Sequence, residues 1–365
     1  MQNSTLRQQV VQALLAVLPQ DAVLWRVEDT RPYECDGLSA YRRLPMVVAL
    51  PHTEAQVQAV LRVCHQLQVP IVPRGAGTGL SGGALPLEAG VVLSTARLNK
   101  IEQIDPLGRS ALVQPGVRNL AISEAAKAHG LYYAPDPSSQ IACTIGGNVA
   151  ENSGGVHCLK YGLTLHNVLA VRLALADGEI VELGCAALDS PGLDLLSLVI
   201  GSEGMLGIVT QVRVKLLPVP ASAQVIMASF VDVVQAGEAV AAVIAAGIIP
   251  AGLEMMDQTS VRMVEPFAKA GYDTNAAAIL LCESDGSALE VADEISQMSA
   301  VLRQAGANAL VVSRNEQERG KLWSGRKNAF PAAGRISPDY YCMDGTIPRK
   351  RLADVLNAIE RMQTT

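Results

Sequence analysis

The chain has 365 residues, of which 49% are hydrophobic and 18% are charged, and its formal net charge is −6. This length and composition are typical of a globular protein with about two or three domains. Because the chain has no basic run and only 4% aromatic residues, we do not expect it to bind nucleic acid.

Helices and short strands alternate over residues 1–220. In chain order, we expect a helix over 4–18, a helix over 53–68 opened by the capping box Thr53-Glu54-Ala55-Gln56, strands near 69–73, 90–95 and 110–114, a helix over 116–129 closed by Gly130, a β-hairpin over 168–183 and a long strand over 207–217. Asp177-Gly178 between the hairpin strands predicts a type I′ turn. Pro218 and Pro220 then indicate a domain boundary.

The pattern changes after this boundary to two successive β-α-β groups. The expected strands are 224–230, 251–256, 277–282 and 309–313, and the expected helices are 231–246, 287–305 and one that begins near Asn315. This order is typical of a ferredoxin-like split unit. We therefore expect a second domain over residues 221–365.

A glycine-rich loop follows the strand at 69–73. Gly77 to Gly82 fit the dinucleotide fingerprint G-x-G-x-x-G, which in a Rossmann fold leads into a helix. Here a turn and the strand at 90–95 follow instead, and no acidic residue lies at the distance expected for NAD. The loop therefore predicts a pyrophosphate cradle in a fold other than Rossmann, and an NAD-dependent dehydrogenase is the weaker alternative.

Three glycine-containing segments together resemble a known family. They are Pro73–Gly83, Thr144–Asn148, which we read as part of a loop over 144–155, and Gly201–Ile208. In this order they are similar to the FAD-linked oxidases of the vanillyl-alcohol oxidase type. Within that family, the chain looks most like the branch of glycolate oxidase flavoprotein subunits and D-lactate dehydrogenases.

The resemblance implies an α+β fold. Residues 1–220 would form a PCMH-type FAD-binding domain of two α/β subdomains, and residues 221–365 an incomplete ferredoxin-like substrate (cap) domain. The implied activity is oxidation of a small 2-hydroxy acid, glycolate or D-lactate, with hydride passing to flavin N5. The alternative is a flavin-binding polypeptide without turnover of its own.

The resemblance also implies which residues contact FAD. We expect contacts from Arg74, Gly75, Ala76, Gly77, Thr78, Gly79, Leu80, Ser81, Pro135, Asp136, Ser138, Thr144, Gly146, Gly147, Asn148, Ser153, Gly154, Gly155, Glu203, Gly204, Gly207 and Ile208. Thr144 stands where some relatives attach FAD to a histidine, so we expect non-covalent FAD.

The substrate carboxylate is expected to bind Arg326, in the segment Leu322-Trp323-Ser324-Gly325-Arg326. A planar guanidinium matches two carboxylate oxygens, and the family uses this arginine as a clamp. Residues 340–348 resemble the strand that follows in the family. The family's base and metal-ligand histidines would lie beyond Thr365, so the catalytic base is not assigned and we predict no metal site, although His157 or His166 could face the flavin.

Partners and location follow from the same resemblance. Electrons would pass to an iron–sulfur subunit, a second flavin-type subunit or a quinone. None of the seven cysteines has a C-x-x-C, zinc or iron–sulfur spacing, which favours reduced thiols. With no apolar run of the ~18–20 residues that a membrane span needs, we expect a cytoplasmic protein, alternatively attached peripherally to the inner membrane.

Overall fold

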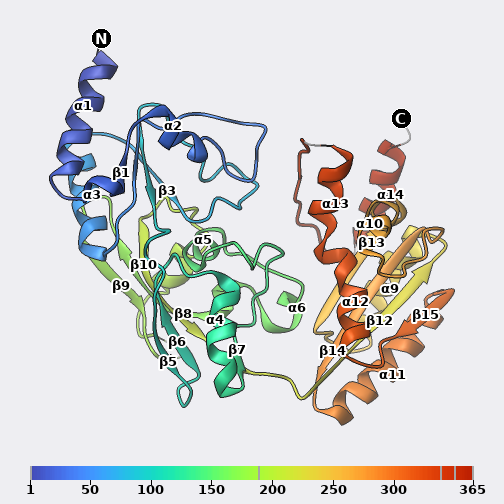
Figure 1. Cartoon of the computed structure of the whole chain (residues 1–365). Helices are drawn as coiled ribbons and strands as arrows, with labels where there is room; N and C mark the ends of the chain where they lie inside the picture. The colour runs from blue at the N-terminus through green and yellow to red at the C-terminus, as the bar shows by residue number, and fades with distance from the viewer. Residues whose placement is uncertain (1, 188–189, 338, 349–350, 364–365) are drawn as a thin grey trace. The chain divides into compact units, whose positions relative to one another are not determined.

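The computed structural model describes residues 2–187, 190–337, 339–348 and 351–363. The chain divides into two units (Figure 1). The first consists of Met1–Gly155 and Gly162–Val219, and the second of Val156–Tyr161 and Pro220–Thr365. The short excursion Val156–Tyr161 therefore packs with the second unit although it lies within the sequence of the first.

The first sheet of unit 1 is mainly parallel. Its strand order is β1 (Val23–Leu24), β2 (Val47–Ala49), β4 (Val91–Ser94), β3 (Ile71–Arg74). Both β2 and β3 run parallel to β4, whose four residues are all buried. Strands buried on both faces read as continuous apolar runs, which is what the sequence has here.

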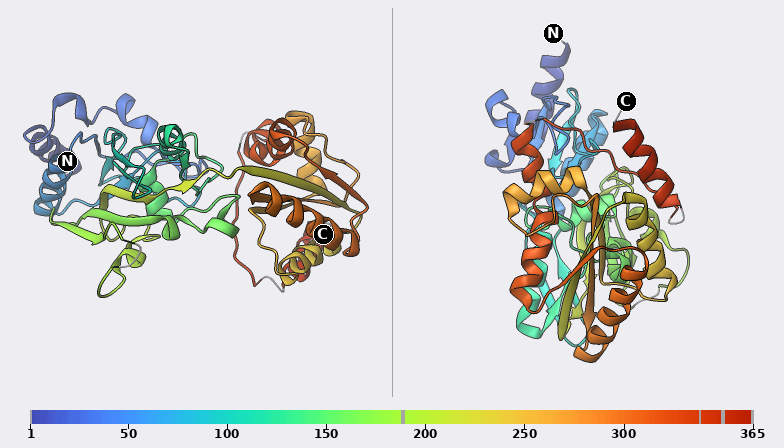
Figure 2. Two further views of the ribbon diagram at one scale, coloured as in Figure 1. Left: turned by 90° about the horizontal axis from the view of Figure 1, so that it is seen from below. Right: turned by 90° about the vertical axis from the view of Figure 1, so that its right-hand side faces the viewer.

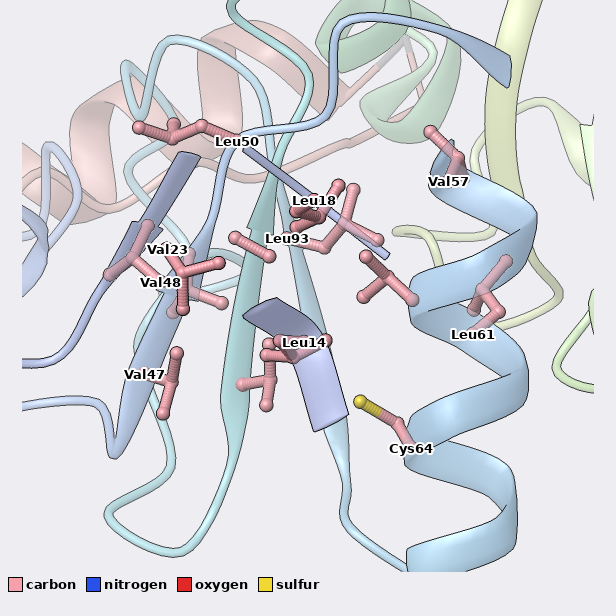
Figure 3. Close-up of a cluster of buried hydrophobic side chains, with 14 of the residues drawn as sticks. Leu14, Leu18, Val23, Val47, Val48, Leu50, Val57, Leu61, Cys64 and Leu93 are labelled. Carbon is pink, nitrogen blue, oxygen red and sulfur yellow. The ribbon is translucent and has the colours of Figure 1, made fainter. Parts of the chain in front are cut away.

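Two helices cover this sheet with one apolar stripe each. They are α1 (Gln2–Leu15) and α3 (Glu54–Leu67). The predicted start of α3 is confirmed, because the Thr53 hydroxyl accepts a hydrogen bond from the Gln56 N–H at 3.2 Å. Figure 3 shows the resulting core, in which side chains from α3 point toward those from the strands and from the α1 segment: Leu14, Leu18, Val23, Val47, Val48, Leu50, Val57, Leu61, Cys64 and Leu93.

The second sheet of unit 1 is antiparallel and has five strands. Its order is β5 (Ile101–Asp105), β6 (Ser110–Val113), β10 (Ile208–Lys215), β8 (Val168–Ala174), β9 (Ile180–Gly184). The helices α4 (Asn119–Ala126) and α5 (Ile145–Glu151) share its apolar core. A short pair of β7 (Leu131–Tyr132) and β11 (Leu217–Pro218) and the short helices α2 (Val27–Thr30), α7 (Thr164–Asn167) and α8 (Leu195–Val199) complete the unit.

The β8–β9 hairpin is present, but the predicted type I′ turn is wrong. Only Gly178 has a positive φ, of 83°, and Asp177 does not. The Gly178 N–H donates to the Leu175 carbonyl at 2.9 Å, and the Leu175 N–H to the Glu179 carbonyl at 2.8 Å. This is the pattern of a type I turn followed by a left-handed glycine, in which one glycine suffices.

The sheet of unit 2 has the predicted ferredoxin-like arrangement. Its antiparallel order is β13 (Gly252–Asp257), β14 (Ala278–Gly286), β12 (Ser222–Phe230), β15 (Ala309–Val312). One face packs against α9 (Val233–Ala245) and α11 (Ala288–Gln304), and the other against α10 (Gln258–Ala268), α12 (Glu316–Lys327) and α13 (Ala329–Ile336). The left view of Figure 2 shows helices on both sides of the strands.

Two segments near the chain end complete this unit. The helix α14 (Leu352–Gln363) packs against α9. The prediction of a strand over residues 340–348 is wrong, because this segment has no regular secondary structure and pairs with no strand in the described ranges. Backbone groups that find no partner strand do not form a ladder. None of the helices that the structure describes is long and apolar enough to cross a membrane.

Candidate functional site

The glycine loop begins where β3 ends, at the carboxyl edge of the parallel sheet. As expected, no helix follows it, and residues 75–90 are irregular. Gly77 and Gly82 have φ values of 72° and 79°, which L side chains rarely adopt. The loop therefore needs glycine at these two positions to present its backbone N–H groups.

The second glycine segment meets this loop directly. A β-carbon placed on Gly75 would lie 2.4 Å from Thr144 Oγ1 and 3.6 Å from the Cα of Gly147. The Thr144 side chain is buried, and its hydroxyl has no hydrogen-bond partner within the described residues. A buried hydroxyl without a partner is unfavourable by roughly 1–3 kcal/mol, so it points to a ligand group that would pair with it.

The segment after Thr144 is a helix, not part of the loop expected over residues 144–155. The seven residues Ile145–Glu151 form α5, which ends at Asn152 in a left-handed conformation with φ of 51°. Gly146 permits this helix to approach Pro115, because a β-carbon at residue 146 would lie 2.6 Å from the proline Cβ. The glycine pair thus serves helix packing on one side and the contact with Gly75 on the other.

The third glycine segment, Gly201–Ile208, contacts both the glycine loop region and α5. The Glu203 N–H donates to the Ala150 carbonyl at 2.8 Å, and Glu203 itself has a φ of 54°. A β-carbon on Gly204 would lie 2.5 Å from Cγ of Pro73, at the end of β3. Gly207 lies in the turn before β10, where Ile208 is buried and pairs with Ala174.

Residues 135–138 and 153–155 form a further contact. A β-carbon on Gly155 would lie 2.5 Å from Asp136 Oδ1 and 2.6 Å from the carbonyl carbon of Asp136. The Pro135 carbonyl accepts a hydrogen bond from Asn119 Nδ2 at 2.9 Å, and Asn119 Oδ1 accepts one from Asn148 Nδ2 at 3.0 Å. This buried amide chain uses the Asn148 side chain for structure, so its predicted FAD contact remains a prediction.

A support for the glycine loop was missed from the sequence. Asp36 is buried and accepts hydrogen bonds from the N–H groups of Leu38, at 2.9 Å, and of Ala84, at 3.4 Å. Arg74 donates to the Cys35 carbonyl at 2.7 Å. Burial lowers the pKa of Arg74, and the charge of Asp36 opposes that shift. Arg74 and Cys35 are 39 residues apart in sequence, and Ala84 and Asp36 are 48 apart, so no local pattern marks these two contacts.

Glu151 is the carboxyl that lies beside the loop. Its Oε1 would be 3.6 Å from a β-carbon on Gly79 and 3.2 Å from one on Gly83. Burial raises the pKa of Glu151, and the neighbouring charges of Glu203 and Asp36 add to this shift. A carboxyl that takes up a proton more readily repels a nearby anion less.

The predicted carboxylate clamp lies in unit 2. Arg326 sits near the end of α12, where its Nε donates to Glu254 Oε2 on β13 at 2.7 Å. Its two terminal nitrogens make no hydrogen bond in the part of the chain that the structure describes. The side chain is 30% exposed, so its fork can take a further oxygen ligand.

A buried carboxylate holds the same helix. Glu283 on β14 accepts hydrogen bonds from Arg319 Nη1, at 2.8 and 3.0 Å, and from Trp323 Nε1, both on α12. His157 Nε2 lies 3.1 Å from Glu283 Oε1. Burial alone would raise the pKa of Glu283, but the hydrogen bond of His157 and the charge of Arg319 outweigh it and the pKa lies below its ordinary value.

The two histidines that were candidates to face the flavin both have side-chain partners within the protein. His157 lies against Glu283, and the His166 ring accepts a hydrogen bond from the Leu163 N–H at 3.1 Å. Within the described ranges, no three His, Cys, Asp or Glu side chains are arranged to hold a metal ion.

Comparisons with known protein families match both units. Residues 45–184 match the family described as FAD binding domain, and residues 219–365 match the family described as FAD linked oxidases, C-terminal domain.

Individual relatives agree with this match. The chain is 60% identical to the protein named glycolate oxidase subunit GlcD of Escherichia coli strain K12, over 98% of this chain and 71% of that protein. It is 40% identical to the Bacillus subtilis protein of the same name, over 90% of this chain and 70% of the relative. A D-lactate dehydrogenase of Anaerostipes hadrus is 33% identical, over 90% of this chain and 71% of the relative.

Solved structures share the fold. An alkyldihydroxyacetonephosphate synthase superposes with a TM-score of 0.79 at 20% identity, covering 97% of this chain and 74% of its own. A substrate-bound p-cresol methylhydroxylase superposes with a TM-score of 0.74 at 19% identity, covering 87% of this chain and 69% of its own. Together with the two family matches, these structures confirm the predicted α+β architecture of a PCMH-type FAD-binding domain followed by an oxidase C-terminal domain.

Proposed function

The chain belongs to the FAD-linked oxidases, and on this premise we propose that it oxidises glycolate or D-lactate to the corresponding 2-oxo acid. The names of the relatives support this substrate class, since two are glycolate oxidase subunits and one is a D-lactate dehydrogenase. The single observation that carries the proposal is the meeting of the three glycine segments, with the unpartnered Thr144 hydroxyl where the first two touch.

The residues around Thr144 fit FAD. Any side chain at Gly75 would clash with Thr144 Oγ1, so glycine is needed where the loop packs against this hydroxyl. Gly77 and Gly82 supply the left-handed backbone that lets N–H groups converge on an anion. We assign the pyrophosphate to residues 74–81 and the remainder of the cofactor to the predicted residues of segments 135–138, 144–148, 153–155 and 203–208.

Arg326 would bind the carboxylate of the acid. Its Nε stays on Glu254, and its terminal nitrogens present two parallel N–H donors to the substrate. Glu254 fixes the plane of this fork, so the acid would be bound in one orientation. Bound FAD supplies the hydride acceptor for the carbon that bears the hydroxyl.

The electron acceptor and the location are further parts of the proposal. Two of the relatives are named as subunits, which supports transfer of electrons to an iron–sulfur or second flavin-type subunit. We place the protein in the cytoplasm or peripherally at the inner membrane.

An anaerobic reduction experiment tests the proposed function. The purified chain is loaded with FAD, and the flavin absorbance near its visible maximum is followed after glycolate, D-lactate or L-lactate is added. Bleaching by glycolate or D-lactate is expected. Bound flavin that neither acid bleaches would contradict the enzymatic role and favour a flavin-binding polypeptide, and binding of NAD without flavin would contradict the cofactor.

A further inference from the structure

One buried carboxylate joins two separate segments of unit 2. Glu283 is 1% exposed and lies in the middle of the sheet on β14. Its partners come from α12, through Arg319 and Trp323, and from the excursion Val156–Tyr161, through His157. A buried charge with this many donors is held in one geometry, because each donor that is lost leaves the charge less well compensated.

The two donors on α12 share a face with the predicted clamp. Arg319, Trp323 and Arg326 are spaced i, i+4 and i+7, which places them on one side of the helix. Gly325 lets this helix approach the buried Tyr272 ring, and Tyr272 donates its hydroxyl to the Leu322 carbonyl. Glu283 and Tyr272 therefore fix both the rotation and the height of α12 above the sheet.

A second carboxylate two residues along β14 holds the other end of the excursion. Asp285 accepts hydrogen bonds from Lys160 Nζ at 2.6 Å and from the Tyr161 hydroxyl at 2.8 and 2.7 Å. Residues two apart on a strand face the same way, so Glu283 and Asp285 hold His157 and Lys160–Tyr161 along one face. The chain immediately before this excursion is Ser153–Gly155, a segment expected to line the flavin.

We propose that Glu283 is a positioning residue for the substrate clamp: by holding α12 through Arg319 and Trp323 and the excursion through His157, it sets the place of Arg326. This inference rests on the proposed function, in which Arg326 binds the substrate carboxylate. Displacement of a binding group by about 1 Å is enough to slow a reaction about a hundredfold. Glu283 can therefore affect substrate binding through the position of Arg326 without touching the substrate itself.

The first test is substrate-site binding in the FAD-loaded protein. Oxalate, an unreactive acid of the size of glycolate, is titrated calorimetrically into the wild type and the variants Glu283→Gln, Arg326→Ala and the double variant. Glu283→Gln keeps the shape of the side chain and removes its charge. We expect its oxalate Kd to rise about tenfold, as for coupled neighbours, and this loss to disappear in the Arg326→Ala background.

The matched control is Glu316→Gln. Glu316 also binds Arg319, at 2.7 and 2.6 Å, but its side chain is 75% exposed and makes no hydrogen bond to Trp323 or His157 within the described residues. This control should leave the oxalate Kd unchanged. Trp323→Phe, which removes one donor and keeps the ring packing, should give a smaller loss than Glu283→Gln.

The second measurement does not depend on substrate or FAD. Backbone hydrogen exchange of the apoprotein should become faster in α12 for Glu283→Gln and stay unchanged for Glu316→Gln. If exchange in α12 and the oxalate Kd are both unchanged in Glu283→Gln while Arg326→Ala loses oxalate, the positioning role is overturned and the clamp survives. If Arg326→Ala itself keeps oxalate, the clamp and the positioning role both fail, although α12 exchange still reports whether Glu283 holds the helix.

Discussion

Gly75 and Thr144, 69 residues apart in sequence, meet so closely that a β-carbon on the glycine would lie 2.4 Å from the threonine hydroxyl oxygen. The hydroxyl is buried and has no partner within the described residues, and it does not cap the helix that it precedes. The contact joins the loop after β3 to the start of α5. This unused hydroxyl is the observation on which the predicted contact of Thr144 with FAD rests.

Replacing Thr144 with valine should separate FAD binding from stability. Valine keeps the shape and removes an unpaired buried hydroxyl, so the free energy of unfolding of the apoprotein should stay equal or rise by up to ~1 kcal/mol. FAD affinity should fall about tenfold through loss of one hydrogen bond. Urea unfolding of the apoprotein and a flavin fluorescence titration measure the two effects.

Thr53→Val is the matched control. The Thr53 hydroxyl caps α3 by accepting from the Gln56 N–H, far from the glycine loop in the sequence. This variant should lose ~1 kcal/mol of stability and keep its FAD affinity. A stability loss in Thr144→Val with unchanged FAD affinity would show that the Thr144 hydroxyl has a structural partner rather than a ligand.

Much of this cradle could be predicted from the sequence, because its glycines stand in local patterns. The glycine loop without a following helix, the β-α-β order after Pro220 and the helix that carries Arg326 were all anticipated. The network of Glu283 could not be predicted in this way. His157 and Glu283 are 126 residues apart, and only the folded sheet brings them together.

Two predictions from the sequence were wrong because contacts with the rest of the fold select one of several conformations that the local residues allow. The Asp177-Gly178 pair is compatible with more than one hairpin turn. The observed hydrogen bonds are those of a type I turn followed by a single left-handed glycine. The glycine pairs over residues 144–155 predicted a loop, but tertiary packing against Pro115 supports a helix there despite the low helix propensity of glycine.

Arg326→Ala should weaken substrate binding with little effect on stability. Loss of a charged partner from a carboxylate is unfavourable by about 2–4 kcal/mol, which corresponds to a rise in KM for glycolate of about 30-fold or more. Arg314→Ala is the control, because Arg314, just before α12, makes an exposed ion pair with Glu318 on that helix, and 83% of the arginine side chain is exposed. Steady-state kinetics of both variants decide the point, and equal KM values for the two would remove Arg326 from the substrate site.

The ion pairs of Glu283 should make stability sensitive to acid. The folded-state pKa lies below the ordinary value of 4.5, so the stabilisation is present above that pH and is lost as the pH falls through the folded-state pKa. At pH 7, Glu283→Gln should lower the free energy of unfolding by about 3 kcal/mol, as expected for breaking a buried ion pair.

The difference between wild type and Glu283→Gln is the quantity to measure, since other carboxyls also titrate. Urea unfolding at several pH values should show this difference constant near neutrality and shrinking below pH 4.5. A difference that grows as the pH falls below 4.5 would mean that Glu283 is protonated in the native protein, contrary to the contacts with Arg319 and His157.

Two glycines on α12 should respond in opposite ways to alanine. A β-carbon on Gly325 would lie 2.2 Å from Cε2 of the buried Tyr272, whereas one on Gly320 would meet nothing within 4 Å. Gly325→Ala should lower the free energy of unfolding by ~1–3 kcal/mol through overpacking. Gly320→Ala should raise it by ~0.5–1 kcal/mol, because alanine is the better helix former at an open position. Thermal unfolding of the two variants gives the comparison directly.

If the helix is held against Tyr272 as described, Gly325→Ala also weakens oxalate binding through Arg326, and Gly320→Ala does not. Equal stabilisation by both alanines would place α12 away from the Tyr272 ring.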